Sequence, residues 1–188
     1  MTKQFSVLLF ALFLVGGGCA AQPVQPVYNE TNEQEEPLVL VDGTYALDTT
    51  SSLIGWEASK VKVTHNGTVD PKEGSVRIQE GAVTEGKVVV DMTTLKNLDQ
   101  EDKFLELLQN HLRSNDFFAV QDNPTSTFDL IQMEPLNGIE GANYRVDGTL
   151  TIKGIEQPLS FPAFVEETEG NLRLKNRSTR CNTNDPLD

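Results

Sequence analysis

The chain has few of the residues that build metal sites and reactive centres. Its 188 residues include two cysteines, Cys19 and Cys181, and two histidines, His65 and His111. A zinc or iron site needs three or four ligands at suitable spacings, and no Cys or His cluster provides them. One cysteine follows a leader segment, so the mature chain has no internal disulfide framework. Motifs of serine hydrolases, phosphate-binding loops and dinucleotide sites are also missing, and the sequence therefore does not predict an enzyme.

Positive charge is also scarce. Lys and Arg number 15 against 28 Asp and Glu, which gives a formal net charge of -13 and a pI near 4.5. Binding to nucleic acid requires clustered Lys and Arg that neutralise phosphates. The composition therefore argues against nucleic acid as a partner, and the negative charge is expected to serve solubility.

Only one long apolar run is present, and it lies at the N-terminus. Lys3 precedes the apolar stretch from Phe5 to Val15, and the glycines at 16–18 lead into Cys19. The run is too short to span a bilayer stably as a mature helix, so residues 1–18 are predicted to be a bacterial export signal. A cysteine directly after small residues resembles the lipobox of bacterial lipoproteins, in which this cysteine becomes the lipidated N-terminus.

The position of cleavage decides whether the mature chain is anchored. Cleavage before Cys19 leaves a lipid anchor, whereas ordinary cleavage after Ala21 leaves a soluble periplasmic protein. Ala20, in place of Asp, resembles a signal for sorting to the outer rather than the inner membrane. Residues 19–43 are rich in Pro and Glu and have little periodic apolar content, which is typical of a disordered tether. We expect a membrane-anchored periplasmic lipoprotein with an acidic tether.

The following residues, 44–180, are expected to form one β domain. From Tyr144 to Ile152 every even position is apolar or Gly and every odd position is polar, which predicts a strand with one dry and one wet face. Similar runs recur about eight times along the domain, with glycines where the turns should fall. Eight antiparallel strands can close into a barrel that holds one small apolar ligand.

Three local signals predict how the strands are connected. Apolar residues take even positions at 54–58 and odd positions at 61–63, a change of parity that predicts a β-bulge near Ser59 and Lys60. The pair Asn66-Gly67 predicts a tight hairpin, because both residues tolerate positive φ. The pair Lys153-Gly154 predicts a second tight turn.

One amphipathic helix is expected between the strands. Asp99 is the predicted N-cap, with acidic residues in the first turn that favour the positive end of the helix dipole. Residues at spacings of three and four then form a stripe that should lie on a dry surface. The stripe consists of Phe104, Leu107, Leu108, His111 and Leu112. The helix is predicted to end at 115–116, before the aromatic pair Phe117-Phe118.

Several motifs resemble the YceI-like family. They are Tyr45–Trp56 followed by Lys60, then Thr64–Val69, the helix ending His111–Phe118, and Gly148–Gly154 before Pro158. The resemblance covers roughly residues 44–165, and the motifs agree in order and spacing. It implies an all-β fold: an antiparallel lipocalin-like β-barrel of about eight strands with one α-helix inserted mid-chain.

The same resemblance implies a function. Members of the family bind a long polyisoprenoid chain, such as the tail of a ubiquinone-type quinone, in an apolar lumen. It therefore implies non-enzymatic binding, carriage or storage of a polyisoprenoid lipid in the periplasm. This ligand would take the place of a cofactor, and no catalytic residue is expected. Family membership supports binding more firmly than any physiological task.

The lumen of such a barrel needs a long apolar wall with few polar atoms. Ten side chains on the dry faces are the candidates for that wall. They are Ile54, Trp56, Phe104, Leu108, Phe118, Phe128, Leu130, Val146, Leu150 and Phe161. The same side chains would fill a packed core in a barrel without a ligand, and alternation alone does not separate the two interpretations.

The C-terminal segment departs from the family pattern. In the family, the domain continues past the region matching residues 176–180 with a further strand that closes the barrel, whereas residues 181–188 lack apolar alternation. Either the barrel keeps an open C-terminal edge, or this sequence is a shortened version of a longer one. An open edge would allow two copies to pair as a homodimer.

Two other functions stay open at this point. A surface adaptor or stress-related scaffold would use a filled barrel and contact a partner through its loops. An enzyme acting on a bound lipid would depend on His65 or His111. The simpler interpretation is that His65 bonds the neighbouring backbone and that His111 is an interior histidine on the helix stripe. The lipid-binding barrel is the leading hypothesis.

Overall fold

The computed structural model describes residues 3–10, 15–16, 40–60 and 63–176 of the chain. Within residues 1–18, two strands are described, β1 (Lys3–Phe10) and β2 (Val15–Gly16). The predictions of lipidation at Cys19, of cleavage after Ala21 and of a tail at 181–188 all lie outside the described residues. So does the tether as far as residue 39.

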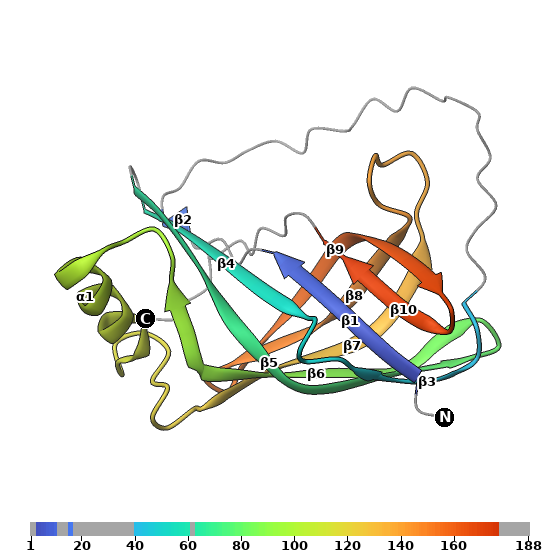
Figure 1. Ribbon diagram of the computed structural model, residues 1–188, viewed down its shortest axis with the longest axis horizontal. Coiled ribbons are helices and arrows are strands. Elements are labelled where there is room, and N and C mark those ends of the chain that lie inside the picture. Colours follow the sequence, from blue (N-terminus) through green and yellow to red (C-terminus); the bar gives the residue numbers. More distant parts are fainter. Residues whose placement is uncertain (1–2, 11–14, 17–39, 61–62, 177–188) are drawn as a thin grey trace.

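The domain is an antiparallel meander of eight strands with one helix inserted (Figure 1). The helix α1 (Asp102–Arg113) lies between β6 and β7. The strands are β3 (Gly43–Leu47), β4 (Leu53–Lys60), β5 (Val63–Gln79), β6 (Ala82–Asn97), β7 (Thr125–Pro135), β8 (Tyr144–Ile152), β9 (Ile155–Thr168) and β10 (Asn171–Lys175). The prediction of an all-β, lipocalin-like barrel of about eight strands with a mid-chain helix is confirmed.

β3 and β4 form one interrupted strand beside β5. The second half of β5 pairs with β3, and its first half pairs with β4. Between them the chain turns at Asp48, whose Oδ1 accepts the Thr50 hydroxyl at 2.7 Å and the Thr50 N–H at 2.9 Å. The hydroxyls of Thr50 and Ser51 lower the pKa of Asp48 to about 2. An ionised Asp48 therefore holds this turn at neutral pH.

Two-residue turns with a glycine join several neighbouring strands. Lys153 and Gly154 connect β8 to β9 with φ of 54° and 75°, which confirms the predicted turn. Glu80-Gly81 connects β5 to β6 and Glu169-Gly170 connects β9 to β10, and both residues of each pair have positive φ. Positive φ at both positions gives a turn whose twist matches that of the flanking strands. The glycines at these positions therefore set the register of the meander.

The reversal between β4 and β5 differs from the prediction. Lys60 pairs with Val63, so a strand reversal, and not a bulge near Ser59 and Lys60, accounts for the change of parity. Asn66-Gly67 lies inside β5, so the hairpin predicted there is wrong. Bulges occur elsewhere, as three register shifts between β5 and β6 and one between β7 and β8.

β1 lies in the seam where the two ends of the meander meet. Among the described strands, β10 is not paired with β3 or with β4. β1 runs parallel to β10 on one side and parallel to β3 and β4 on the other. In Figure 1 it is the dark blue strand between β4 and β10. The eight antiparallel strands thus form a nearly closed barrel whose own hydrogen bonds do not seal the seam.

The interior holds two apolar clusters. Cluster A comprises the buried residues Leu40, Tyr45, Val76, Ile78, Phe128, Tyr144, Val146, Phe161, Ala163, Val165, Leu172 and Leu174. Cluster B lies nearer α1 and comprises Ile54, Trp56, Val69, Val90, Met92, Leu95, Leu112, Phe118 and Val120. Val88 is half-buried and packs against both clusters. The interior of the barrel is therefore mainly apolar at both ends.

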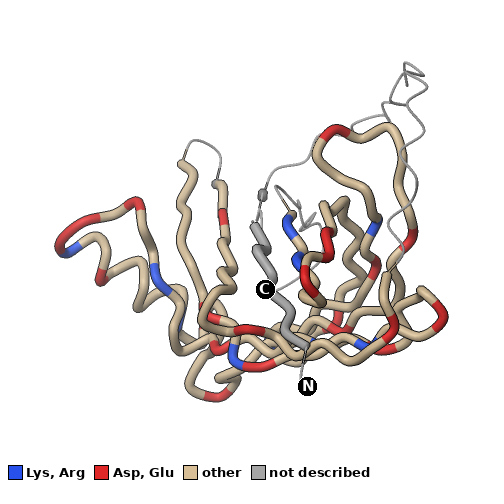
Figure 2. The backbone as a smooth tube through the Cα atoms, turned by 45° about the vertical axis from the view of Figure 1, so that its right-hand side comes forward, with Lys and Arg blue, Asp and Glu red and all other residues tan. Residues whose placement is uncertain are grey.

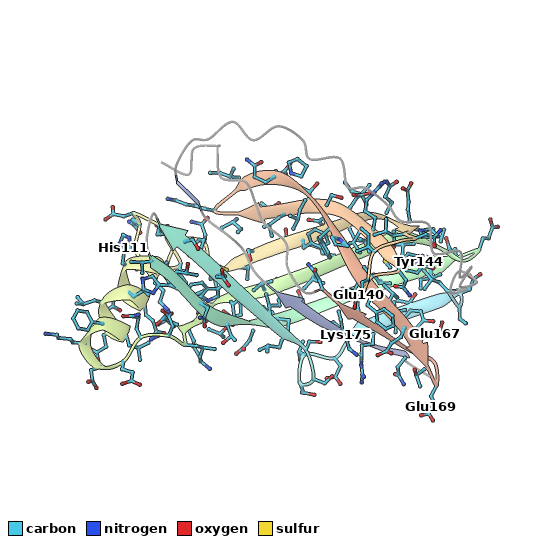
Figure 3. The ribbon with its side chains drawn as sticks, turned by 90° about the horizontal axis from the view of Figure 1, so that it is seen from above. His111, Glu140, Tyr144, Glu167, Glu169 and Lys175 are labelled. Carbon is cyan, nitrogen blue, oxygen red and sulfur yellow. The ribbon has the colours of Figure 1, made fainter. Side chains whose placement is uncertain are left out.

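Tyr45 anchors cluster A at the end of the barrel away from α1. Figure 3 shows Glu167 at that end and His111 at the opposite one. The Tyr45 side chain is fully buried, and its hydroxyl lies 2.9 Å from the carbonyl oxygen of Val41 and 3.3 Å from Oε1 of Glu167. Burial and the negative charge of Glu167 raise the pKa of Tyr45 to about 12.

We expect Tyr45→Phe to lower the free energy of unfolding by about 1 kcal/mol at pH 8, because a hydrogen-bonded hydroxyl is lost. The folded-state pKa lies above the unfolded-state value of about 10. The stabilisation is therefore fully present below that value and is lost as the pH rises through the folded-state pKa. Urea unfolding of the wild type and Tyr45→Phe at several pH values from 8 upward should show that the difference in their free energies of unfolding decreases. A difference in the free energy of unfolding that stays constant across this pH range would contradict the prediction.

Candidate ligand-binding interior

Nine of the ten predicted wall residues lie in the barrel interior. They belong to a cluster or pack against one, and the exception is Phe104. Phe128, Val146, Phe161, Leu130 and Leu150 belong to or line cluster A, and Ile54, Trp56, Phe118 and Leu108 belong to or line cluster B. Their contact with a ligand stays a prediction, because the same placement would serve a packed core.

The helix stripe does not lie on the barrel along its whole length. Leu112 is buried and Leu108 is half-buried, but Phe104 is 59% exposed and Leu107 is 64% exposed. α1 packs against β6, and Figure 1 shows the helix at one end of the barrel. Only its C-terminal part therefore finds an apolar surface to cover. The expectation that Phe104 faces the dry interior is wrong.

The turn after α1 is held by two cationic side chains. Nη2 of Arg113 donates to the carbonyl oxygen of Leu95 on β6 at 2.6 Å. Nζ of Lys153, in the turn between β8 and β9, donates to the carbonyl oxygens of Asn115 and Phe117, both at 3.1 Å. Residues 111–118, which carry the family resemblance, thus fix the end of the helix to β6 and to the turn between β8 and β9.

Part of the interior wall is not fully covered. On β8, Tyr144 and Val146 are buried, whereas Leu150 on the same face is half-buried. Leu130 on β7 and Leu159 on β9 are also half-buried and pack against cluster A. Strand alternation places all of them on the interior face. Apolar surface left uncovered beside a packed core is a surface that an apolar ligand can cover.

Gly148 makes room for an aromatic ring in the middle of the barrel. It lies between Leu130 on β7 and Leu159 on β9. A Cβ at Gly148 would fall 2.6 Å from Cε2 of Phe128, so the ring lies directly over the glycine. The Phe128 and Phe161 rings are 5.8 Å apart between centroids. Both rings belong to cluster A, against which Leu130, Leu150 and Leu159 pack.

Leu159 and Val88 are among the interior residues that the wall prediction missed. Both pack against cluster A while remaining half-buried. Alternation carried a signal for each, because Leu159 shares its parity with Phe161, and Val88 shares its parity with Val90.

A polar cluster lies outside the apolar interior, just before α1. Nδ1 of His65 lies 2.8 Å from Oδ2 of Asp99. The Asp99 carboxylate also accepts the backbone N–H of Asn66 at 3.0 Å, Nε2 of Gln100 at 3.1 Å and the side-chain amide of Asn97. Within the part of the chain that the structure describes, His65 contacts Asp99 and Gln100, and neither carries a nucleophilic hydroxyl or thiol.

Asp99 does not cap the helix, in contrast to the prediction. α1 begins at Asp102, and the N-cap residue Glu101 makes no side-chain cap hydrogen bond. Burial acts to raise the pKa of Asp99, but the hydrogen bonds from Asn66, His65, Gln100 and Asn97 outweigh it and hold the pKa well below its usual range. The ionised carboxylate ties β5 to the segment that leads into α1.

His111 is not an interior histidine. Its side chain is exposed on α1, and its ring centroid lies 5.9 Å from that of Phe117. Figure 3 shows it on the helix at the end of the barrel. The expectation of a satisfied histidine inside the barrel is therefore wrong for this residue.

Charged residues are spread over the molecule and do not gather at one site. Figure 2 shows Asp and Glu along the helix, the turns and the strands, with fewer Lys and Arg between them. In the described ranges, no group of three or more His, Cys, Asp or Glu side chains is placed to hold a metal ion. A search of the same ranges finds no helix with the length and apolar character needed to cross a membrane.

The fold and its interior define an antiparallel lipocalin-like β-barrel with an apolar interior and a helix at one end. The YceI-like domain model matches residues 45–184, well over half of the chain. The protein therefore belongs to the YceI-like family, as the sequence motifs predicted. The comparison with curated proteins finds no match.

Two solved structures are similar to this chain. The YceI protein of Campylobacter jejuni is 20% identical, with 50% of this chain and 51% of that chain covered and a TM-score of 0.38. BcnA of Burkholderia cenocepacia is 19% identical, with 57% and 64% covered and a TM-score of 0.43. The aligned part of this chain thus spans about half of the Campylobacter protein and less than two thirds of BcnA.

Proposed function

We propose that this protein binds a polyisoprenoid lipid with a quinone-type tail in the barrel interior, and that it carries or stores this lipid without catalysing a reaction. The observation that carries the proposal is the half-buried apolar wall formed by Leu130, Leu150 and Leu159 beside cluster A. Each CH₂ group that leaves water contributes about 0.8 kcal/mol. A prenyl tail would complete the cover of these side chains, and membership of the family supports the same ligand class.

The proposed setting is the periplasmic face of the outer membrane. Residues 1–18 would direct export, Cys19 would carry the acyl anchor, and residues 19–43 would tether the barrel. The apolar run from Phe5 to Val15, followed by small residues and Cys19, supports this arrangement. In this setting the membrane holds both the anchor and the source of the lipid.

The environment of the histidines supports a role without catalysis. His65 is bound to Asp99 and ties β5 to the segment before α1. His111 is exposed beside Phe117. Neither histidine is among the described residues that form or pack against cluster A, so neither is placed to act as an acid or base on the proposed tail.

The test is mass spectrometry of an organic extract from protein produced with its own leader in a bacterial host and purified gently. We expect close to one prenyl lipid per chain. Leu150→Trp places a large ring in the uncovered part of the interior and is expected to lower the bound lipid at least tenfold, a loss of about 1.4 kcal/mol. Thr149→Trp, on the adjacent residue and the opposite face, is the matched control and should keep the lipid.

Two results would contradict the proposal. One is a folded protein, judged by circular dichroism, that carries no prenyl lipid. The other is equal lipid content in Leu150→Trp and Thr149→Trp. The intact mass of the same preparation also reports whether Cys19 carries acyl chains, so anchor and ligand are measured separately.

A surface adaptor is the second candidate, and the exposed side of α1 favours it. Phe104, Leu107 and Leu98 are large apolar side chains that are each more than half exposed near the same end of the barrel. Exposed apolar side chains that lie close together are typical of contact surfaces. In this function the barrel would be a filled scaffold. A well-folded, empty protein that is insensitive to Leu150→Trp would favour the adaptor.

A further inference from the structure

The seam of the barrel is one strand wide. β1 pairs with β10 on one side and with β3 and β4 on the other. The two edges of the meander are therefore separated by two strand spacings, about 9.5 Å. Backbone groups at that distance cannot hydrogen-bond to each other. Within the described residues, only β1 links the two edges by backbone pairing.

The register of β1 bridges both edges at the same residue. Phe5 is the Cα partner of Leu172 on β10 and also of Leu47 on β3. Further along, the same strand passes from β3 to β4 while it stays paired with β10. β1 is therefore a central strand and not an appendage on one edge. A central strand has to offer backbone groups on both of its sides.

The sequence of β1 suits this position. Residues 4–10 contain no charged residue, no Pro and no Gly. Pro would remove a backbone N–H from the ladder, and Gly would weaken the strand. The segment can therefore pair along its whole length.

The residues beside the seam are buried and need protection from water. Leu172 and Leu174 on β10 are 1% and 6% exposed, and Tyr45 on β3 is fully buried. At one end, Glu167 on β9 reaches across the seam to the Tyr45 hydroxyl at 3.3 Å and to the N–H of Val41 at 3.1 Å. An empty seam would expose the backbone edges and admit water beside cluster A.

We propose that the seam is a strand-acceptor site for an extended, largely apolar segment, and that residues 3–10 occupy it in the unprocessed chain. Main-chain hydrogen bonds on both sides supply the affinity, as in other cases of β-strand addition. Removal of the leader then vacates this acceptor site, so processing controls its occupancy by residues 3–10. The inference is independent of the proposed ligand, because the strand closes the seam with or without a lipid inside.

A disulfide in register tests the proposal in the full chain. The protein is made without export, so that the leader stays attached, and carries Cys19→Ser and Cys181→Ser. Ser6→Cys is combined with Arg173→Cys, because these two residues are Cα partners. The Cα atoms of paired neighbours lie about 5 Å apart, within the range that a disulfide bridges. Mild oxidation followed by peptide mapping reports the cross-link.

The matched control is Ser6→Cys combined with Lys175→Cys. Lys175 lies two residues further along β10, so its Cα is about 8 Å from that of residue 6, beyond the reach of a disulfide. Arg173 and Lys175 are both exposed, and both pair with Glu166. We expect the pair at 6 and 173 to cross-link at least ten times more than the control, within one chain.

Three results would overturn the proposal: equal cross-link yields in the two cysteine pairs, no cross-link in either pair, or a cross-link between two chains. The last result would mean that the seam binds β1 of a second copy. A second measurement needs no cysteine. Val7→Pro removes an N–H from the middle of β1, and we expect hydrogen exchange of the β10 amides to rise at least tenfold relative to Val7→Ile. Unchanged exchange would also overturn the proposal, whatever the lipid extract contains.

Discussion

Replacing Gly67 by alanine is expected to lower the free energy of unfolding by about 3 kcal/mol, at the upper end of the range for overpacking. Gly67 lies in β5 between Trp56 on β4 and Asn97 on β6. The Trp56 indole crosses over the glycine, and its Nε1 donates to the carbonyl oxygen of Lys96 at 3.1 Å. A Cβ at position 67 would overlap both that carbonyl oxygen and the indole ring. Backbone on one side and a buried ring on the other leave little room for relaxation.

The effect can be followed by urea unfolding, with the fluorescence of Trp56, the only tryptophan in the chain, as the signal. A loss of about 3 kcal/mol corresponds to a fall in Tm of about 6–12 °C for a domain of this size. Gly141→Ala is the control, because Gly141 has a φ of +76° but no atom within 4 Å of its Cβ position. Backbone strain alone should cost about 1 kcal/mol there. Equal losses in the two variants would show that packing at Gly67 is not the cause.

Replacing Asp99 by asparagine is expected to lower the free energy of unfolding by about 3 kcal/mol at pH 7, since hydrogen bonds to a charged acceptor contribute about 1.5–3 kcal/mol. The carboxylate accepts four donors, from His65, Asn66, Asn97 and Gln100. An amide would turn one of its atoms into a donor that faces other donors. The link between β5 and the start of α1 should therefore loosen.

The dependence on pH identifies the charge as the cause. The folded-state pKa of Asp99 is depressed below the unfolded-state value of about 4. Its stabilisation is therefore fully present above that value and is lost as the pH falls through the folded-state pKa. Unfolding in urea at pH 7 and at acidic pH should show the difference between the wild type and Asp99→Asn shrinking in acid. A difference that does not depend on pH would contradict this explanation.

Asp122→Asn serves as the control for the loss of an acidic side chain. Asp122 is exposed in the loop between α1 and β7. Its replacement should change the free energy of unfolding by less than about 0.5 kcal/mol, as for most surface positions. A similar loss in both variants would point to overall charge as the cause, in place of the cluster around Asp99.

The features of the fold that depend on nearest neighbours could be predicted from the sequence. The strand from Tyr144 to Ile152 has the predicted bounds, and the turn at Lys153-Gly154 lies where it was expected. Alternation and positive φ are local properties, because they depend on the backbone of a few consecutive residues. The family motifs extended this local information to the whole barrel.

Two of the predictions that failed depended on which more distant segment lies alongside. Asn66-Gly67 has the composition of a hairpin, yet its glycine accommodates Trp56 from the neighbouring strand. Asp99 has the composition of an N-cap, yet its carboxylate binds His65 from β5. The same residue types serve a turn, a cap or a close contact, and only the paired strands decide among these roles.

The candidate site shows the same division. Parity along the strands placed seven of the ten wall residues inside, because side chains alternate regardless of what they face. Leu108 on α1 and Phe118 in the segment after the helix also pack in cluster B. The apolar stripe predicted on α1 has the expected spacing. Phe104 is nevertheless exposed, because the helix packs against β6 over only part of its length. Parity could not show that Leu130, Leu150 and Leu159 stay half-buried, because that depends on which side chains of other strands pack over them.

The sequence by itself thus determined an all-β domain of the YceI-like family, its alternating faces, its glycine turns and the apolar character of its interior. The tertiary structure alone decided how that interior is divided between packed rings and uncovered leucines, which end of α1 is exposed, and what lies in the seam between β10 and β3–β4. Local periodicity fixes the face on which a side chain lies, whereas the closing of a barrel depends on contacts between the first and the last strands. Those contacts join residues more than 100 positions apart, as Tyr45 and Glu167 do, and no local pattern encodes them.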